Sequence, residues 1–565
     1  MSNVPASATP ARRGLWRWSV ALLATVLMVV VGSGLVAFAQ SGAGASRGPV
    51  FLPADTSVYV EGRLDMPDGQ ADAMAEFMSA FPGFADMGSF QMIFEQALDG
   101  LMSEATYGEY SYTEDLMALM TGEVGVGILD LAGAAMMESQ PPPVLAGVAV
   151  SDPAAASEFI SGLAQSETGA ELVEEPYGAT SILSDAENAI AVAGDWVLMA
   201  PTVDLVQTGI DVLSGEAPSL ADDADFSKAW ARVPAAHILA AYMDFASLGP
   251  LMDLASQAAA GETGMTIDLE GLSEQLPTDM VAYLTAEADR MTLEAFITPS
   301  EQMPAMAMGE SDLAARFPAD TQLYVETREL GATLATTIGG LLATMDEQTA
   351  ADMAPLEDMF GVPLPELLDF VSDASVGASL SSDGLWLGIA AEVTDEELAN
   401  DRVERILSIV RLLGAGLGGE DAPEISVDET VIGDTDVTTI TLPIEEVTGG
   451  QLPVTIPDTL SVAISDGTLL IGLGDFVENA LTQAEADSLA ASPEYVDALG
   501  EDTSNLGLVY ANIGSFLGMI DPLLATMAPE WADIAPYATA LDRIIAVGTV
   551  DEEVISARMS VIVAP

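Results

Sequence analysis

A short stretch that occurs twice constrains this chain more than any other feature. Residues 53–63 read PADTSVYVEGR, residues 318–328 read PADTQLYVETR, and eight of the eleven positions are identical. Later matches keep a similar spacing, such as Tyr242 with Tyr510. Two copies of one opening motif predict a tandem duplication, in which each copy begins with the same strand.

The repeated stretch has the alternation of a β-strand. Val58 and Val60 point to one face, whereas Tyr59, Glu61 and Arg63 point to the other. The same three positions in the second copy are Tyr324, Glu326 and Arg328. We interpret Tyr-x-Glu-x-Arg as a row of ion pairs on a sheet face. A contact for an anion or a peptide is the alternative.

The segments after each motif alternate short strands and tight hairpins with helices. This order indicates an α+β fold with largely antiparallel sheets packed by helices. The expected organisation is a first α+β domain at 51–300, a linker at 301–315 and a second, homologous domain at 316–565. Half of all residues are hydrophobic (50%), so each domain can bury a large core.

The N-terminal region has the pattern of an export segment. Residues 1–18 are basic, residues 19–39 are apolar and uncharged, and residues 40–50 form a small-residue linker. About 20 apolar residues can span a bilayer, and the preceding positive charge keeps that end in the cytoplasm. Ala37-Phe38-Ala39 also fits a signal cleavage site. We expect a single-pass anchor with the bulk of the chain outside the cytoplasm, or a secreted protein if the signal is cleaved.

The charge balance is strongly acidic, with 88 Asp and Glu against 15 Lys and Arg and a formal net charge of −73. Such a body is repelled by nucleic acid and by anionic membrane surfaces. We expect a salt-adapted protein, whose melting temperature rises across a KCl series because salt screens the self-repulsion. A surface that collects divalent cations is the alternative. The absence of cysteine excludes disulfides and Cys-ligated zinc.

Few residues have the pattern of a catalytic or metal site. His237 is the only histidine, so a His cluster cannot form, and we interpret it as structural. Asp222, Asp223 and Asp225 are dense enough for calcium, but they lack the spacing of an EF-hand. The matching segment 491–494 reads ASPE, which favours a helix cap in both copies. We therefore assign no catalytic, cofactor or metal residues.

Methionine is the other candidate feature, with 27 in the chain. Those in the helical region 69–120 are Met74, Met78, Met87, Met92, Met102, Met117 and Met120. Flexible thioethers fill irregular cores, and they also line adaptable apolar grooves. Core filling is the interpretation we favour, and a groove for a lipid, hydrophobic peptide or partner helix is the alternative.

The PADT-x-x-Tyr-Val motif follows an N-terminal apolar segment and recurs later in the chain. In this respect residues 50–565 resemble a bacterial family of exported, membrane-anchored proteins of unknown function. The resemblance implies an envelope location and a non-catalytic role, and the family offers no established cofactor or catalytic residue to carry over. We therefore expect a membrane-tethered extracytoplasmic protein that binds or scaffolds an envelope partner. The alternatives are a carrier of an apolar ligand that uses the Met-rich helices, and an acid-based, glycosidase-like hydrolase.

Overall fold

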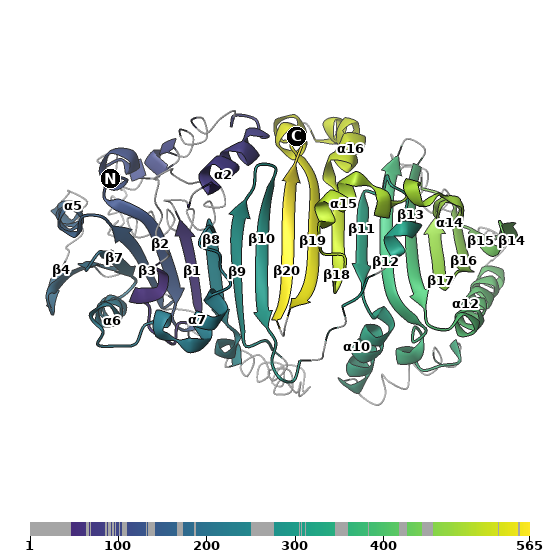
Figure 1. Ribbon diagram of the computed structural model, residues 1–565, viewed down its shortest axis with the longest axis horizontal. Helices are drawn as coiled ribbons and strands as arrows, with labels where there is room; N and C mark the ends of the chain where they lie inside the picture. Colours follow the sequence, from purple (N-terminus) through teal and green to yellow (C-terminus); the bar gives the residue numbers. More distant parts are fainter. Residues whose placement is uncertain are drawn as a thin grey trace, which may run out of the picture. The chain divides into compact units, whose positions relative to one another are not determined.

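A computed structural model describes residues 47–564 with internal gaps (Figure 1). The gaps are 64–66, 68, 85–87, 89–91, 93–94, 97, 101, 104–109, 132, 134–141, 166–172, 186–187, 250–275, 304–305, 307, 311, 345–356, 358–359, 382–383, 417–425, 443–455, 529 and 552–553. The chain divides into two compact units, Met1–Met303 and Pro304–Pro565. The division falls inside the segment 301–315 that the sequence predicts as a linker.

The first unit is built on an antiparallel sheet. Its strands are β1 Val58–Arg63, β2 Met120–Ile128, β3 Val144–Val150, β4 Val173–Tyr177, β5 Thr180–Ser184, β6 Ala189–Ala193, β7 Trp196–Ala200, β8 Leu239–Asp244, β9 Asp279–Ala286 and β10 Arg290–Thr298. Their order across the sheet is β4-β5-β6-β7-β3-β2-β1-β8-β9-β10. The repeated strand β1 therefore lies inside the sheet, between β2 and β8.

The second unit has the same order of strands. They are β11 Leu323–Thr327, β12 Val371–Ser381, β13 Gly384–Val393, β14 Ser426–Ile432, β15 Thr435–Thr441, β16 Thr459–Ser465, β17 Thr468–Leu473, β18 Gly507–Asn512, β19 Leu541–Asp551 and β20 Val554–Val563. The order is β14-β15-β16-β17-β13-β12-β11-β18-β19-β20. Each strand is equivalent to the strand numbered ten lower in the first unit. The architecture is mainly antiparallel sheet with helices, of the α+β kind.

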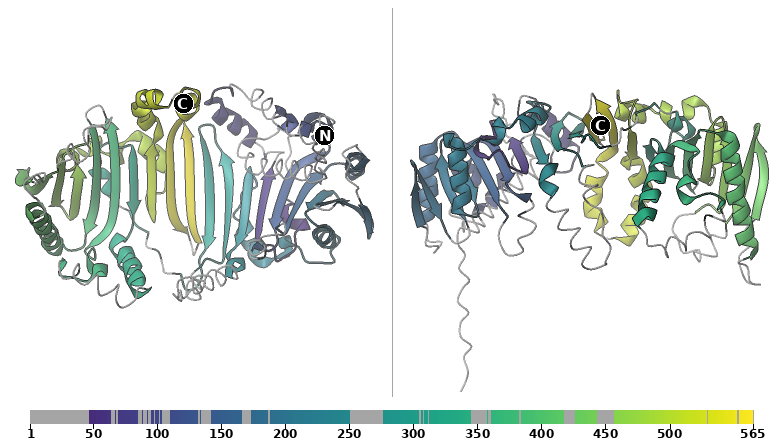
Figure 2. Two further views of the ribbon diagram at one scale, coloured as in Figure 1. Left: turned by 180° about the vertical axis from the view of Figure 1, so that it is seen from behind. Right: turned by 90° about the horizontal axis from the view of Figure 1, so that it is seen from below.

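Helices pack against these sheets (Figures 1 and 2). The α-helices are α2 Gln70–Ser79, α5 Pro153–Gln165, α6 Val203–Ser214 and α7 Ala224–Trp230 in the first unit, and α10 Leu330–Thr344, α12 Glu396–Gly416, α14 Phe476–Thr482, α15 Pro493–Leu499, α16 Ile513–Met527 and α17 Trp531–Ala538 in the second. The short helices η1 Gly48–Phe51, η3 Leu220–Asp222, η5 Leu313–Arg316 and η8 Leu489–Ala491 precede or link them. None of the helices in the described part of the chain is long and apolar enough to cross a membrane, and the predicted segment 19–39 lies outside that part.

One face of each sheet carries the main core. In the first unit, Tyr59, Trp196 and Tyr242 are buried in this core with residues of η1, α6 and α7. In the second unit, Tyr324 and Tyr510 are buried in the equivalent core with residues of η5, α14 and α15. Alternation along the strands sends every second side chain to the opposite face. Each unit therefore has a core face and a second face.

Glycines in the strands let large side chains lie directly on the sheet. A Cβ atom at Gly377 would lie 2.4 Å from the ring of Phe317, and one at Gly127 would lie 2.5 Å from the side chain of Leu52. These pairs occupy equivalent places, because Gly127 is opposite Tyr59 and Gly377 is opposite Tyr324. The close packing fixes η1 and η5 over the repeated strand.

Candidate functional site

The repeated strand of the first unit places a buried polar cluster under the core helices. The Tyr59 hydroxyl donates a hydrogen bond to Glu61 Oε2 at 2.7 Å. Nε2 of His237 lies 3.0 Å from Glu61 Oε1, and Nδ1 lies 2.7 Å from the carbonyl oxygen of Pro234. Burial, followed by the charge of Glu61, raises the pKa of Tyr59 well above its usual value. Both nitrogens of His237 are thus engaged inside the fold.

Glu123 joins this cluster to the start of the described chain. It is opposite Arg63 in the sheet, and its Oε1 accepts hydrogen bonds from the backbone N–H groups of Arg47 (2.7 Å) and Gly48 (2.5 Å). The guanidinium of Arg47 also contacts the Glu123 carboxylate and lies 5.3 Å from the centre of the Trp196 ring. Burial, followed by the charge of Glu61, raises the pKa of Glu123. The last residues of the predicted linker 40–50 are therefore held firmly against the unit and begin the short helix η1.

The second unit builds the equivalent cluster with different partners. The Tyr324 hydroxyl donates to Glu326, as its counterpart does in the first unit. The Arg328 guanidinium lies 2.5 Å from Glu326 Oε1, 2.9 Å from Asp373 Oδ2 and 2.9 Å from Asn505 Oδ1. The predicted ion pairs at 326 and 328 are therefore present. They are buried within the unit, on the face of the sheet that carries the core.

One of the exchanges between the two clusters replaces a histidine by an asparagine. Tyr59 pairs with Tyr242, and Tyr324 pairs with Tyr510. His237 lies five residues before Tyr242, and Asn505 lies five residues before Tyr510, so the two occupy equivalent positions. The sequence alone does not bring these residues to the repeated strand, because about 180 residues separate them from it in each copy.

The other candidates from the sequence have structural roles. Oδ1 of Asp223 accepts hydrogen bonds from the N–H groups of Asp225 (3.0 Å) and Phe226 (2.8 Å), and so caps α7. Ser492 caps α15 at the equivalent place. No cluster of three potential metal ligands occurs among the described residues. The preference for helix caps over a calcium site is in agreement with this geometry.

The Met-rich region mostly contributes to the core where it is described. Met74, Met78 and Met102 are buried, whereas Met92 is exposed. Met87 lies outside the described residues. The exposed apolar surface that a ligand needs is instead found on a sheet of the second unit.

Two rows of apolar side chains cross that sheet on its second face. From β13 to β20, the first row is Leu387, Ala378, Leu323, Ala511, Ile544 and Val561, and the second row is Ile389, Val376, Val325, Val509, Ala546 and Met559. None of these twelve residues is charged or buried. Six are exposed by 36–45%, namely Leu323, Val325, Val376, Leu387, Val509 and Met559. We call these twelve residues the apolar face.

The apolar face differs from the usual outer side of an antiparallel sheet. Such a side normally alternates with the core side and carries polar residues. Single exposed apolar residues are common, but a contiguous patch marks a place of binding. The apolar face is therefore the candidate functional site.

The first unit has the same two rows, but with less exposure. They are Val144, Ile128, Val58, Met243, Met280 and Ile297, and Ala146, Val126, Val60, Ala241, Ala282 and Ala295. All twelve are apolar, none is in the exposed class, and Ala146 is buried. The second row is also smaller, with four alanines. Apolar character is thus common to both units, whereas open access is a property of the second.

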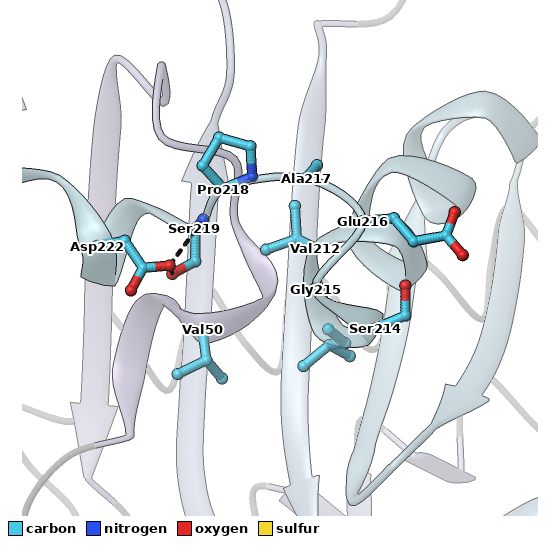
Figure 3. Close-up of a pocket in the computed structure, with 10 residues that line it drawn as sticks. Val50, Val212, Ser214, Gly215, Glu216, Ala217, Pro218, Ser219 and Asp222 are labelled. Carbon is cyan, nitrogen blue, oxygen red and sulfur yellow. Dashed lines mark hydrogen bonds between the residues drawn. The ribbon is translucent and has the colours of Figure 1, made fainter.

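An open pocket of about 650 Å³ lies at the end of α6 in the first unit (Figure 3). It is lined by Val50, by residues 212–219 and by Asp222. The Ser219 hydroxyl donates to Asp222 Oδ2 at 2.8 Å, and Glu216 points away from this pair. The polar groups of the lining serve the turn itself, so we assign no ligand to this pocket.

Comparison with known proteins places this α+β protein in a family. The chain belongs to the family described as "Protein of unknown function (DUF3352)", whose profile matches residues 20–356. The expectation of a family of unknown function is therefore confirmed. No curated protein matches the chain.

Several solved structures also match, among them two of low similarity. Crystal form III of TP0453 is 11% identical, with a TM-score of 0.24, over 47% of this chain and 90% of that chain. Crystal form I of TP0453 is 11% identical, with a TM-score of 0.23, over 47% of this chain and 83% of that chain. At these scores the likeness supports no conclusion about function.

Proposed function

We propose that this protein is a membrane-tethered, extracytoplasmic binding protein built from two homologous domains, and that it holds an apolar ligand without catalysing a reaction. The duplication is supported by the identical strand order of the two units and by the shared motif at 53–63 and 318–328. The tether is supported by the uncharged segment 19–39 behind three arginines.

The observation that carries the binding role is the apolar face of the second unit. Water in contact with this face is released when a ligand covers it. At about 25 cal/mol per Å², covering roughly 200 Å² of apolar surface favours the complex by about 5 kcal/mol, before the cost of immobilising the ligand. The proposed site is therefore the sheet. The Met-rich region 69–120 is the less suitable site, because Met74, Met78 and Met102 are buried in the core.

A photo-crosslinking experiment tests this role. The full chain is reconstituted in phosphatidylcholine vesicles and exposed to a long-chain alcohol that carries a diazirine in its tail. We expect labelled peptides from β11, β12 and β18. Leu323→Asp should reduce this labelling at least tenfold, because a ligand would have to cover an ionised carboxylate.

Val431→Asp is the matched control. Val431 is a strand valine of the same unit, exposed by 64% and outside the two rows. This substitution should leave labelling unchanged. Leu323→Ala, which adds no charge, should give an intermediate value and guards against misfolding of the Asp variant. Equal labelling of the parent and Leu323→Asp proteins would refute the proposal.

A further inference from the structure

We propose that the ligand of the apolar face is an amphiphile with an aliphatic chain and a neutral or positively charged headgroup. This inference rests on the proposed binding role and adds the chemical class of the ligand. It is carried by the shape of the face and by the distribution of charge around it.

The shape of the face favours an extended chain. Each row crosses six strands, which at about 4.8 Å between neighbours gives a length of roughly 24 Å. The two rows are two residues apart along the strands, so they are about 7 Å apart. Even with the width of the side chains added, the band is therefore clearly longer than it is wide. An aliphatic chain lying across the strands covers both rows.

The three helices described next to the face offer no cation for an anionic headgroup. The helix α10 lies against β12, α16 lies against β12 and β19, and α17 packs on α16. None of the three helices contains a lysine or an arginine, and α10 has no charged residue at all. The single charged residue of α16, Asp521, accepts a hydrogen bond from Nε1 of Trp531 at 2.8 Å.

Five of the seven arginines in the second unit make side-chain contacts within the protein. Arg328 is buried in the cluster of the repeated strand. Arg405 contacts the Phe360 carbonyl, Arg411 contacts Glu429, Arg543 contacts Asp497 and Asp542, and Arg558 contacts Asp502. The other two are Arg316, which ends η5 on the core side, and Arg402 on α12, which packs on β14 and β16 outside the six strands of the face. With a formal net charge of −73, the whole chain repels a carboxylate or phosphate monoester and attracts an amine.

Three probes with one tail and different headgroups test the inference. Diazirine-bearing long-chain amine, alcohol and carboxylate are added separately to the full chain in phosphatidylcholine vesicles. For each probe, the labelling of β11 and β18 peptides in the Leu323→Asp protein is subtracted as background. This removes differences in how strongly the three probes partition into the vesicles. We expect the amine and the alcohol to label these peptides at least fivefold more than the carboxylate, and raised salt to narrow the gap.

A charge substitution sharpens the test. Thr327 is exposed on β11, on the same side as Leu323 and Val325. Thr327→Lys should raise labelling by the carboxylate several-fold and leave labelling by the alcohol unchanged, whereas Thr327→Gln should change neither.

The two proposals fail in different ways. Carboxylate labelling equal to that of the alcohol would overturn the headgroup inference and leave the binding role standing. Absence of labelling by all three probes would overturn the binding role itself.

Discussion

The two units share one backbone plan but stabilise its centre differently. In the first unit, the buried carboxylate of the repeated strand faces Tyr59 and His237; in the second, the equivalent carboxylate faces Tyr324 and Arg328. Asn505, in the place of His237, accepts from Arg328 instead of contacting the carboxylate. The strand order therefore tolerates an exchange of partners, provided that the buried glutamate keeps hydrogen-bonded ones.

A second difference concerns the outer side of the sheet. Both units carry two apolar rows there, but only the second exposes large side chains from them. Equivalent strands thus do not imply equivalent access. Access depends on what packs on that face, and in the first unit Ala146 is buried in a cluster with residues of α5.

The largest effect is expected from removal of the cation in the second cluster. Arg328→Met leaves Glu326 and Asp373 without their buried partner, which should lower the free energy of unfolding by about 3–5 kcal/mol. Hydrogen exchange of β11 and β18 peptides during denaturant unfolding would measure this in the second unit alone. Arg411→Met, which breaks an exposed pair with Glu429, should cost less than about 1 kcal/mol. Similar losses for both variants would contradict the assigned role of the cluster.

The next effect tests whether the partners are interchangeable. His237→Asn gives the first unit the residue that the second unit has at this position. It does not supply the contact that Asn505 makes with Arg328. The carboxylate of Glu61 then loses a hydrogen-bond partner, and we expect a loss of about 1–3 kcal/mol in the first unit. Hydrogen exchange of β1 and β8 peptides is the measurement. Unchanged hydrogen exchange of these peptides would show that Glu61 does not need His237 as a partner.

A smaller difference, of about 1–2 kcal/mol between two variants, is expected at the equivalent glycines Gly377 and Gly127, because they contact different side chains. Gly377→Ala presses on the rigid ring of Phe317 and should cost about 2–3 kcal/mol, towards the upper end for overpacking. Gly127→Ala presses on Leu52, whose side chain can change rotamer, and should cost about 1 kcal/mol. Thermal unfolding of the two variants compares them. The opposite ranking would show that the η1 and η5 packing is not equivalent.

The smallest effect is the pH dependence that Glu123 gives the first unit. The raised pKa of Glu123 means that the folded unit takes up a proton at higher pH than the unfolded chain, whose glutamate titrates near 4.3. Stability should therefore rise as the pH falls through the folded value, and the gain is complete below the unfolded value. Glu123→Gln should flatten this rise, as followed by hydrogen exchange of β2 peptides between pH 4 and 7. An unchanged slope would exclude Glu123 as its source.

The sequence by itself determined the features with a local cause. Alternation fixed the two faces of the repeated strand, and turn and cap residues placed the hairpins and the helix start at Asp223. The buried Tyr-Glu-Arg triplets could be predicted as ion-pair residues, because their spacing of two directs them to one face. Their burial could not be predicted from this spacing, since any sheet face can point to water or to helices.

Only the tertiary structure decided which residues meet and which surface stays open. His237 and Asn505 reach the repeated strand because β8 and β18 pair with it from far along the chain. The apolar rows read in sequence like ordinary core strands, and their exposure depends on where helices such as α10 and α16 lie. Burial is a sum over distant neighbours, so the open face of the second unit emerges only once the whole fold is assembled.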